Sequence, residues 1–251
     1  MTLVRSATQS AYWYPQAVVP AAGVGSRMKA DRPKQYLLVA GKAVLEHTVE
    51  KLLSHPNISK VVVAITEGDP YYPELAIANH PDVIRVDGGS ERADSVLSGL
   101  RYVSTQRLSE WVLVHDAARP CVTHDDIDKL IEQCLLEDQG GILSAPVVDT
   151  MKCAKENTCD DKVEVKSTID RSNLWHAFTP QMFKTKELKQ AIEKAQINGL
   201  TITDEASAIE SVGLPCQLIS GRRDNIKITR PEDLVLADFY LNQQKTENKK
   251  G

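Results

Sequence analysis

Short apolar runs alternate along the chain with segments whose apolar residues recur every three or four positions. Apolar, β-branched runs are typical of strands buried on both faces of a parallel sheet, whereas the longer spacing predicts a helix with one buried face. The runs predict strands at 17–19, 61–65, 83–86, 111–114, 142–148, 216–219 and 226–228. The helical spacing predicts helices at 44–53, 71–78, 92–103, 127–136, 186–198, 204–211 and 231–241, the fourth capped by Thr123.

This order of elements predicts an α/β fold. Strands that alternate with helices form a Rossmann-like, mostly parallel twisted sheet flanked by helices, with right-handed crossovers. Residues 162–166 depart from this pattern, because polar and apolar side chains alternate there as in an exposed strand. Two such strands around the polar segment 156–161 predict a protruding β-hairpin arm over about 149–172. A lone hairpin is marginally stable, so we expect the arm to pack on something, with a second subunit as a candidate.

Length and composition bound the remaining possibilities. The 251 residues predict an N-terminal extension over 1–15, a single domain over 16–242 and a polar tail over 243–251. Hydrophobic residues make up 42% and charged residues 25%, which excludes collagen-like and wholly disordered chains. The formal net charge of -4 and the lack of a long apolar run predict neither a nucleic-acid nor a membrane partner. The five cysteines include no CxxC pair, and no secretory signal precedes them, so we expect the cytoplasm.

The segment after the first predicted strand carries the strongest chemical signal. Small residues at 20–25, including Gly23 and Gly25, allow a backbone to approach a phosphate closely, and Arg27 and Lys34 add two cations. The third glycine of a dinucleotide fingerprint is absent, because Met28 stands there, and no Gly-Lys-Ser/Thr of a Walker loop follows. The segment, with small residues, Gly-x-Gly, Arg27 and then Pro33-Lys34, resembles a nucleotidyltransferase signature.

Further segments narrow this resemblance. They are Gly88 to Val96, His115 to Pro120, Asp170-Arg171, Thr179 to Gln181, Thr203 to Ala206 and Asp224 to Lys227. Together they resemble the cytidylyltransferases of the non-mevalonate isoprenoid pathway from about residue 17 to 241. The resemblance implies transfer of CMP from CTP to 2-C-methyl-D-erythritol 4-phosphate, with release of pyrophosphate. A sister enzyme for another polyol phosphate such as ribitol 5-phosphate, a non-catalytic nucleotide sensor and a dinucleotide-dependent oxidoreductase remain as alternatives.

The same resemblance implies roles for individual residues. Arg27 and Lys34 are expected to bind the triphosphate and stabilise the transition state, and Arg171 and Lys227 are expected to supply cations for the second substrate. The expected nucleotide contacts are Ala21, Ala22, Gly23, Gly25, Gly89 and Ser95, and the expected substrate contacts are Thr150, Arg171, Thr179, Thr203 and Lys227. Arg171 and Thr150 would serve the neighbouring site of a homodimer joined through the arm.

One carboxylate is expected at the triphosphate. Asp116 follows the predicted strand 111–114, at the end where open α/β sheets bind ligands. A carboxylate there repels a triphosphate unless a cation intervenes, so Asp116 is a candidate Mg²⁺ contact, with Asp224 as a second candidate. The attacking phosphate monoester has a second pKa of about 6 and is ionised at neutral pH, so the reaction needs no general base.

Overall fold

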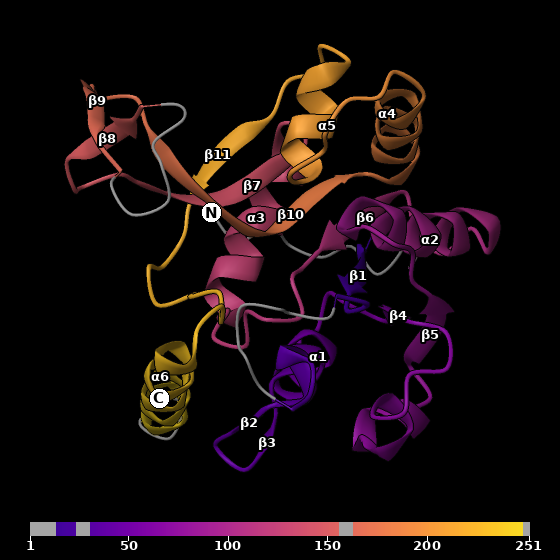
Figure 1. Ribbon diagram of the computed structural model, residues 1–251. Helices are drawn as coiled ribbons and strands as arrows, with labels where there is room; N and C mark the ends of the chain where they lie inside the picture. The colour runs from indigo at the N-terminus through magenta and orange to yellow at the C-terminus, as the bar shows by residue number, and fades with distance from the viewer. Residues whose placement is uncertain (1–13, 24–30, 156–162, 248–251) are drawn as a thin grey trace.

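The computed structural model describes residues 14–23, 31–155 and 163–247. Gly25 and Arg27 therefore lie outside the described residues. Within these ranges, seven strands form one central sheet in the order β11-β7-β10-β6-β1-β4-β5 (Figure 1). The strands are β1 (Gln16–Pro20), β4 (Val61–Ile65), β5 (Val83–Asp87), β6 (Trp111–Val114), β7 (Gly141–Pro146), β10 (Trp175–Lys184) and β11 (Gln217–Ser220).

The sheet is mostly parallel, as predicted. β1 pairs in parallel with β4 and β6, β4 with β5, and β7 with β11. The exception is β10, which is antiparallel to both of its neighbours, β6 and β7. The sequence pattern predicts no strand there.

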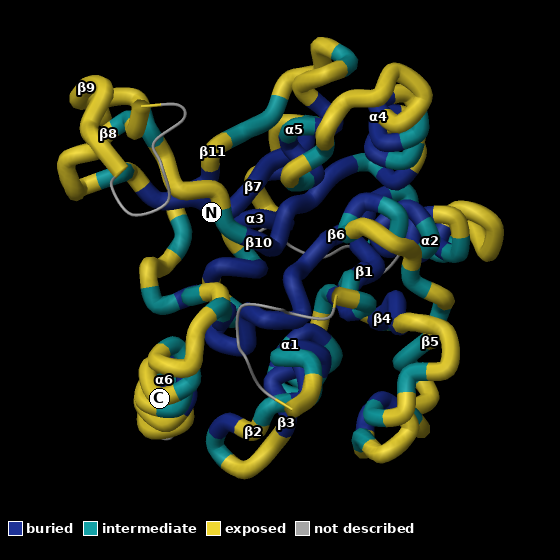
Figure 2. Tube along the Cα trace, in the orientation of Figure 1, coloured by how far each residue is buried: buried dark blue, intermediate teal, exposed yellow. Residues whose placement is uncertain are grey.

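Helices cover both faces of the sheet because successive strand residues point to opposite sides. Ala17 and Val19 of β1 pack in one core with the first and third helices, while Val18 packs in a second core with the other three sheet-covering helices. The five helices are α1 (Val44–Leu53), α2 (Arg92–Thr105), α3 (His124–Leu136), α4 (Thr185–Ile197) and α5 (Glu205–Ser211). Figure 2 shows the resulting buried strands inside a half-buried helical layer.

A third, smaller core positions the C-terminal part of the chain. Helix α6 (Pro231–Glu247) packs Ala237 and Leu241 against Val39 and Ile228. The helix was predicted to end near 241 and continues to Glu247. The predicted strand at 226–228 is wrong, since residues 225–229 form no ladder and Ile228 N donates a single hydrogen bond, to Ala118 O at 2.9 Å.

Short elements complete the fold. The predicted helix at 71–78 is instead two 3₁₀ turns, η4 (Tyr72–Glu74) and η5 (Ala76–Asn79). A further 3₁₀ turn, η3 (Lys34–Tyr36), precedes the small hairpin of β2 (Leu38–Val39) and β3 (Lys42–Ala43).

The predicted hairpin arm is present. Strands β8 (Met151–Ala154) and β9 (Val165–Ile169) pair antiparallel and project from the body of the molecule (Figure 1). Every residue of β9 is exposed, and in β8 only Cys153 is half-buried. The arm is therefore largely uncovered by the described part of its own chain. Across the described ranges, no helix combines the length and the apolar character needed to cross a membrane.

Candidate active site

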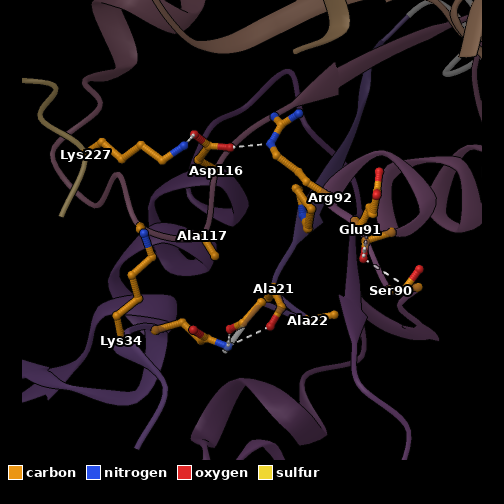
Figure 3. Close-up of a pocket in the computed structure, with 15 residues that line it drawn as sticks. Ala21, Ala22, Lys34, Ser90, Glu91, Arg92, Asp116, Ala117 and Lys227 are labelled. Atoms are coloured by element: carbon orange, nitrogen blue, oxygen red, sulfur yellow. Dashed lines mark hydrogen bonds and ion pairs between the residues drawn. The ribbon is translucent and has the colours of Figure 1, made fainter. Parts of the chain in front are cut away.

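A pocket opens where the carboxyl ends of β1 and β6 meet the start of α2 (Figure 3). Ligands of open α/β sheets bind at this edge because the loops that follow parallel strands converge there. Its lining consists of Pro20 to Gly23, Lys34, Gln35, Gly89 to Arg92, Ser95, Asp116 to Ala118 and Lys227. The pocket thus brings together eight of the predicted site residues: Ala21, Ala22, Gly23, Lys34, Gly89, Ser95, Asp116 and Lys227.

Two lysines from distant segments meet at this pocket. Lys34 begins η3, and its Nζ donates a hydrogen bond to Ile228 O at 3.0 Å. Lys227 precedes Ile228, and its Nζ lies 2.8 Å from Asp116 Oδ2. Figure 3 shows the two side chains on the same side of the pocket, with Asp116 between Lys227 and Arg92. Lys34 therefore also fastens the segment that carries the second lysine.

A glutamine holds the backbone that directly follows β1. Gln35 is buried, and its Nε2 donates to Ala21 O at 2.8 Å and to Gly23 O at 3.0 Å. Ala21 N in turn donates to Ala64 O at 2.9 Å. These bonds fix the backbone at Ala21 and Gly23, in the segment that carries the predicted phosphate contacts. Gln35 stands beside Lys34 in the sequence motif, but sequence reasoning gave it no role.

The glycine turn at the other wall allows a close approach of three segments. A Cβ on Gly88 would overlap the Cβ of Ala22, and a Cβ on Gly89 would overlap that of Asp94. Gly89 N donates to Ser95 Oγ at 3.1 Å, so Ser95 holds the turn against the first turn of α2. The predicted nucleotide contacts on the two walls therefore lie side by side.

Asp116 is the centre of an ion-pair network. Its Oδ1 lies 2.9 Å from Arg92 Nε, and its Oδ2 lies 2.8 Å from Lys227 Nζ and 3.6 Å from Arg119 Nε. Burial alone would raise the pKa of Asp116, but Arg92, then Lys227 and Arg119, hold that pKa well below its usual range. The carboxylate is therefore ionised near neutral pH and unsuited to accept a proton.

A buried chain of hydrogen bonds fixes the backbone of Asp116. Asp116 N donates to Thr179 Oγ1 at 3.0 Å, and the same hydroxyl lies 3.1 Å from His115 Nδ1. His115 Nε2 lies 2.9 Å from the carbonyl oxygen of Arg119, which only accepts, so Nε2 carries the proton and the Thr179 hydroxyl donates to Nδ1. Burial lowers the pKa of His115 to about 4, in keeping with a neutral ring.

Several predicted substrate contacts do not line this pocket in a single chain. Thr150 and Arg171 are exposed at the base of the arm, one before β8 and the other after β9, and Thr203 is exposed just before α5. Thr179 is buried behind Asp116 instead of facing the pocket. Asp224 is paired with Arg222, whose NH2 lies 2.6 Å from its Oδ2.

Other residues of the site were missed. Arg92 lines the pocket, and Glu205 pairs with it from α5 at 2.7 Å. Arg92 lies in the quoted motif Gly88 to Val96, which was the available signal for it. Nothing in the sequence connects it to Glu205.

The described side chains of the pocket do not form a complete metal site by themselves. Among the described residues, no group of three or more His, Cys, Asp or Glu side chains is placed to hold an ion. Mg²⁺ in nucleotide sites is commonly held by one or two carboxylates together with substrate phosphates and water. The ionised Asp116 carboxylate at the pocket wall fits that arrangement, whereas Asp224 lies outside the pocket lining.

Known proteins are similar to this chain in fold and in sequence. A family model for IspD, 2-C-methyl-D-erythritol 4-phosphate cytidylyltransferase, matches residues 16–243. A protein of Vibrio parahaemolyticus named 2-C-methyl-D-erythritol 4-phosphate cytidylyltransferase is 67% identical over 230 residues, which cover 91% of this chain and 96% of that protein. A protein of Colwellia psychrerythraea with the same name is 57% identical over 230 residues, which cover 90% of this chain and 94% of that protein.

Solved structures are also similar to this chain. The crystal structure of 2-C-methyl-D-erythritol 4-phosphate cytidylyltransferase from Francisella tularensis matches with a TM-score of 0.75 at 36% identity, covering 90% of this chain and 99% of that one. A crystal structure of a 4-diphosphocytidyl-2C-methyl-D-erythritol synthase matches with a TM-score of 0.77 at 34% identity, covering 91% and 99%. The family match spans the whole sheet and every element that lines the pocket. The chain therefore belongs to the 2-C-methyl-D-erythritol 4-phosphate cytidylyltransferase family.

Proposed function

We propose that this chain transfers the cytidylyl group of CTP to 2-C-methyl-D-erythritol 4-phosphate, forming 4-diphosphocytidyl-2-C-methyl-D-erythritol and pyrophosphate for isoprenoid synthesis. Membership of the family supports the identity of both substrates. The observation that carries the proposal is the convergence of Lys34 and Lys227 on one pocket, whose lining also includes Arg92, Asp116 and the small residues at 20–23. Such a pocket accepts a nucleotide polyphosphate and a second phosphorylated molecule.

The chemical step needs charge stabilisation more than proton transfer. A phosphate oxygen of the acceptor forms a bond to the α-phosphorus of CTP, and the bond from that phosphorus to the pyrophosphate oxygen breaks. Because the second pKa of a phosphate monoester is about 6, the attacking oxygen already carries its charge at neutral pH. Asp116 is held ionised by three cations, and His115 is sealed by two hydrogen bonds, so neither acts as the base.

Lys34 and Lys227 lower the electrostatic barrier that remains. Two polyanions must approach, and charge builds on the transferring group and on the leaving pyrophosphate. We assign Lys34, with Arg27 seven positions before it in the sequence, to the triphosphate and the transition state, and Lys227 to the phosphate of the acceptor. Loss of one preorganised donor of this kind typically costs about 3 kcal/mol, or a hundredfold to a thousandfold in rate.

Asp116 is the residue that would hold Mg²⁺ at this pocket. When bound, the ion neutralises phosphate charge. Asp116 also serves without the ion, because its two oxygens hold Arg92 and Lys227 in place.

Cytosine recognition is assigned to the walls formed by Ala21, Ala22, Gly89 and Ser95. Cytosine presents an exocyclic amino donor where uracil presents an acceptor, so backbone carbonyls at this site favour cytosine. The overlap that a Cβ on Gly89 would create explains why this wall has no side chain there.

We assign the acceptor site to residues from both subunits of a homodimer. Arg171 and Thr150 lie on the exposed arm and do not line the pocket of their own chain. We assign them to the pocket of a second subunit that the arm embraces, together with Lys227 and Thr203 of that subunit. We assign the enzyme to the cytoplasm.

The experiment combines the protein and Mg²⁺ with each of four nucleoside triphosphates and a panel of acceptors that includes ribitol 5-phosphate. Pyrophosphate is expected only with CTP and 2-C-methyl-D-erythritol 4-phosphate. Lys34→Ala should lower kcat/KM at least a hundredfold. The matched control is Lys186→Ala, because Lys186 is exposed on α4 and away from the pocket. Turnover of another nucleotide, or an unimpaired Lys34→Ala enzyme, would refute the assignment.

A further inference from the structure

We propose that Glu205, which lies outside the pocket lining, is a positioning residue for cytidylyl transfer and acts through Arg92 and Asp116 on Lys227. This inference rests on the proposed function for its kinetic consequence. Its structural basis is a continuous line of ion pairs that begins on α5 and ends at a pocket lysine.

The line begins with a two-point contact. Arg92 NH1 lies 2.7 Å from Glu205 Oε1, and Arg92 NH2 lies 3.0 Å from Glu205 Oε2. The side chain of Glu205 is 1% exposed, and that of Arg92 is 28% exposed. Paired bonds of this kind fix the plane of the guanidinium as well as its position, which a single bond does not.

The third bond of the same guanidinium orients Asp116. Arg92 Nε donates to Asp116 Oδ1 at 2.9 Å, so rotation of the Arg92 plane would remove the contact that orients this carboxylate. Asp116 Oδ2 then holds Lys227 Nζ at 2.8 Å. Each step is a direct contact, and a displacement of Arg92 therefore reaches the lysine through two ion pairs.

Glu205 is itself rigidly held. Gln181 of β10 accepts a hydrogen bond from Ala206 N at 3.0 Å and donates one to Asp204 Oδ2 at 2.9 Å. Asp204 also caps α5 by accepting from Ser207 N at 2.9 Å. The first turn of α5 is thus anchored to the central sheet, which makes Glu205 a fixed point for Arg92.

The charges of the network predict different effects of a Glu205 substitution for a positioning role and for a merely structural role. Within the network, Asp116 contacts Arg92, Arg119 and Lys227, whereas Glu205 contacts Arg92. Removal of the Glu205 charge therefore makes the pocket wall more cationic. Binding of anionic CTP should then stay equal or tighten, while the chemical step slows because Lys227 is misplaced. A structural residue would lower stability and leave kcat of the folded enzyme unchanged.

The test uses Glu205→Gln, with Glu205→Asp as the conservative variant and Glu210→Gln as the matched control. Glu210 is exposed on the same helix and does not line the pocket. Glu205→Gln should lower kcat tenfold to a hundredfold with KM for CTP unchanged or lower. Glu205→Asp should recover part of kcat because it keeps the charge, and Glu210→Gln should match the wild type. The effect of Glu205→Gln should largely vanish in a Lys227→Met background, since both changes remove the same contribution.

A second readout does not depend on turnover. Labelling of Lys227 by an amine-reactive reagent, followed by mass spectrometry, should be faster in Glu205→Gln than in the wild type, with Lys186 as the internal reference. Unchanged labelling and unchanged kcat in a folded Glu205→Gln enzyme would overturn the inference, as would a full effect in the Lys227→Met background. If the wild type itself released no pyrophosphate, the proposed function would fail, and the labelling rate would still decide whether Glu205 positions Lys227.

Discussion

A single hydroxyl holds the backbone of the central carboxylate. Thr179 Oγ1 accepts from Asp116 N and donates to His115 Nδ1, and all three residues are buried. Its removal leaves two buried polar groups without partners, and each such group costs about 1–3 kcal/mol. The predicted substrate contact at Thr179 is better explained as a support behind the pocket.

Thr179→Val should therefore lower the free energy of unfolding by about 2 kcal/mol and also reduce kcat, because Asp116 loses its backbone anchor. Thr179→Ser keeps the hydroxyl and should remain close to the wild type in both properties. Urea denaturation and steady-state kinetics measure the two effects. Equal stability of the Val and Ser variants would contradict the assigned hydrogen bonds.

Sequence reasoning found the site residues that lie in short motifs. Lys34, Gly89 and Asp116 each follow or precede a predicted strand end within a recognisable segment, and they line the pocket. The Arg92–Glu205 pair escaped because 113 positions separate the two residues, and local patterns do not reveal which charges meet across a fold. The role of Gln35 escaped for another reason, because its partners are backbone carbonyls, which every residue carries.

At the scale of elements, β10 was the strand that pattern reasoning missed. Its ten residues include Pro180, which weakens a strand prediction, and its first three residues are exposed while the following ones become buried. A register shift between Ala177 and Gln181 accommodates the proline. The opposite error occurred at 226–228, where an apolar pattern reflects packing of Ile228 in the small third core without strand pairing.

The contact between α2 and β1 depends on one glycine. A Cβ on Gly99 would lie 2.5 Å from Val18 Cγ1, and Val18 is fully buried on a strand paired on both sides. Overpacking of this kind costs about 1–3 kcal/mol, against a gain of about 1 kcal/mol in helix propensity.

Gly99→Ala should accordingly destabilise the fold by about 1–2 kcal/mol in chemical denaturation. Val18→Ala removes the methyl groups that the new Cβ would meet, but it has a cost of its own. The double variant should therefore lose less stability than the sum of the two single losses. Ser98→Ala, at the half-buried neighbouring position, is the control and should stay within about 0.5 kcal/mol of the wild type. A neutral Gly99→Ala would show that α2 adjusts without strain.

At the scale of the whole molecule, buried histidines make stability depend on pH. The pKa of His115 is about 4 in the folded protein and about 6.5 in an unfolded chain, so its contribution is present above pH 6.5 and is lost as pH falls toward 4. Burial also lowers the pKa values of His47 and His55, which add to the loss in the same direction.

In metal-free buffer, His115 alone should reduce the free energy of unfolding by about 2 kcal/mol between pH 7 and pH 5. His115→Gln should show a correspondingly smaller loss over that range. Denaturation curves at the two pH values measure the difference. The same loss in both proteins would mean that His115 does not remain neutral in the fold.

The proposed dimer predicts that two impaired variants restore activity when they are combined in one dimer. Lys34→Ala damages the pocket of its own subunit, whereas Arg171→Ala should damage the pocket of the partner. Unfolding and refolding an equal mixture of the two variants gives about half mixed dimers, each with one intact site of two. Activity should rise to about a quarter of the wild type, and no rise above the separate variants would argue against shared sites.

The central claim is that charge stabilisation at Lys34 and Lys227 suffices without a proton-abstracting side chain. The most direct test is the pH dependence of the chemical step, measured by rapid quench under single-turnover conditions with the natural acceptor and with its phosphonate analogue, whose second pKa is higher. The account predicts a rate that rises through about pH 6, levels off, and shifts its rise upward with the analogue. A rise that keeps its position when the acceptor is changed would place the ionisation on the enzyme and contradict the account.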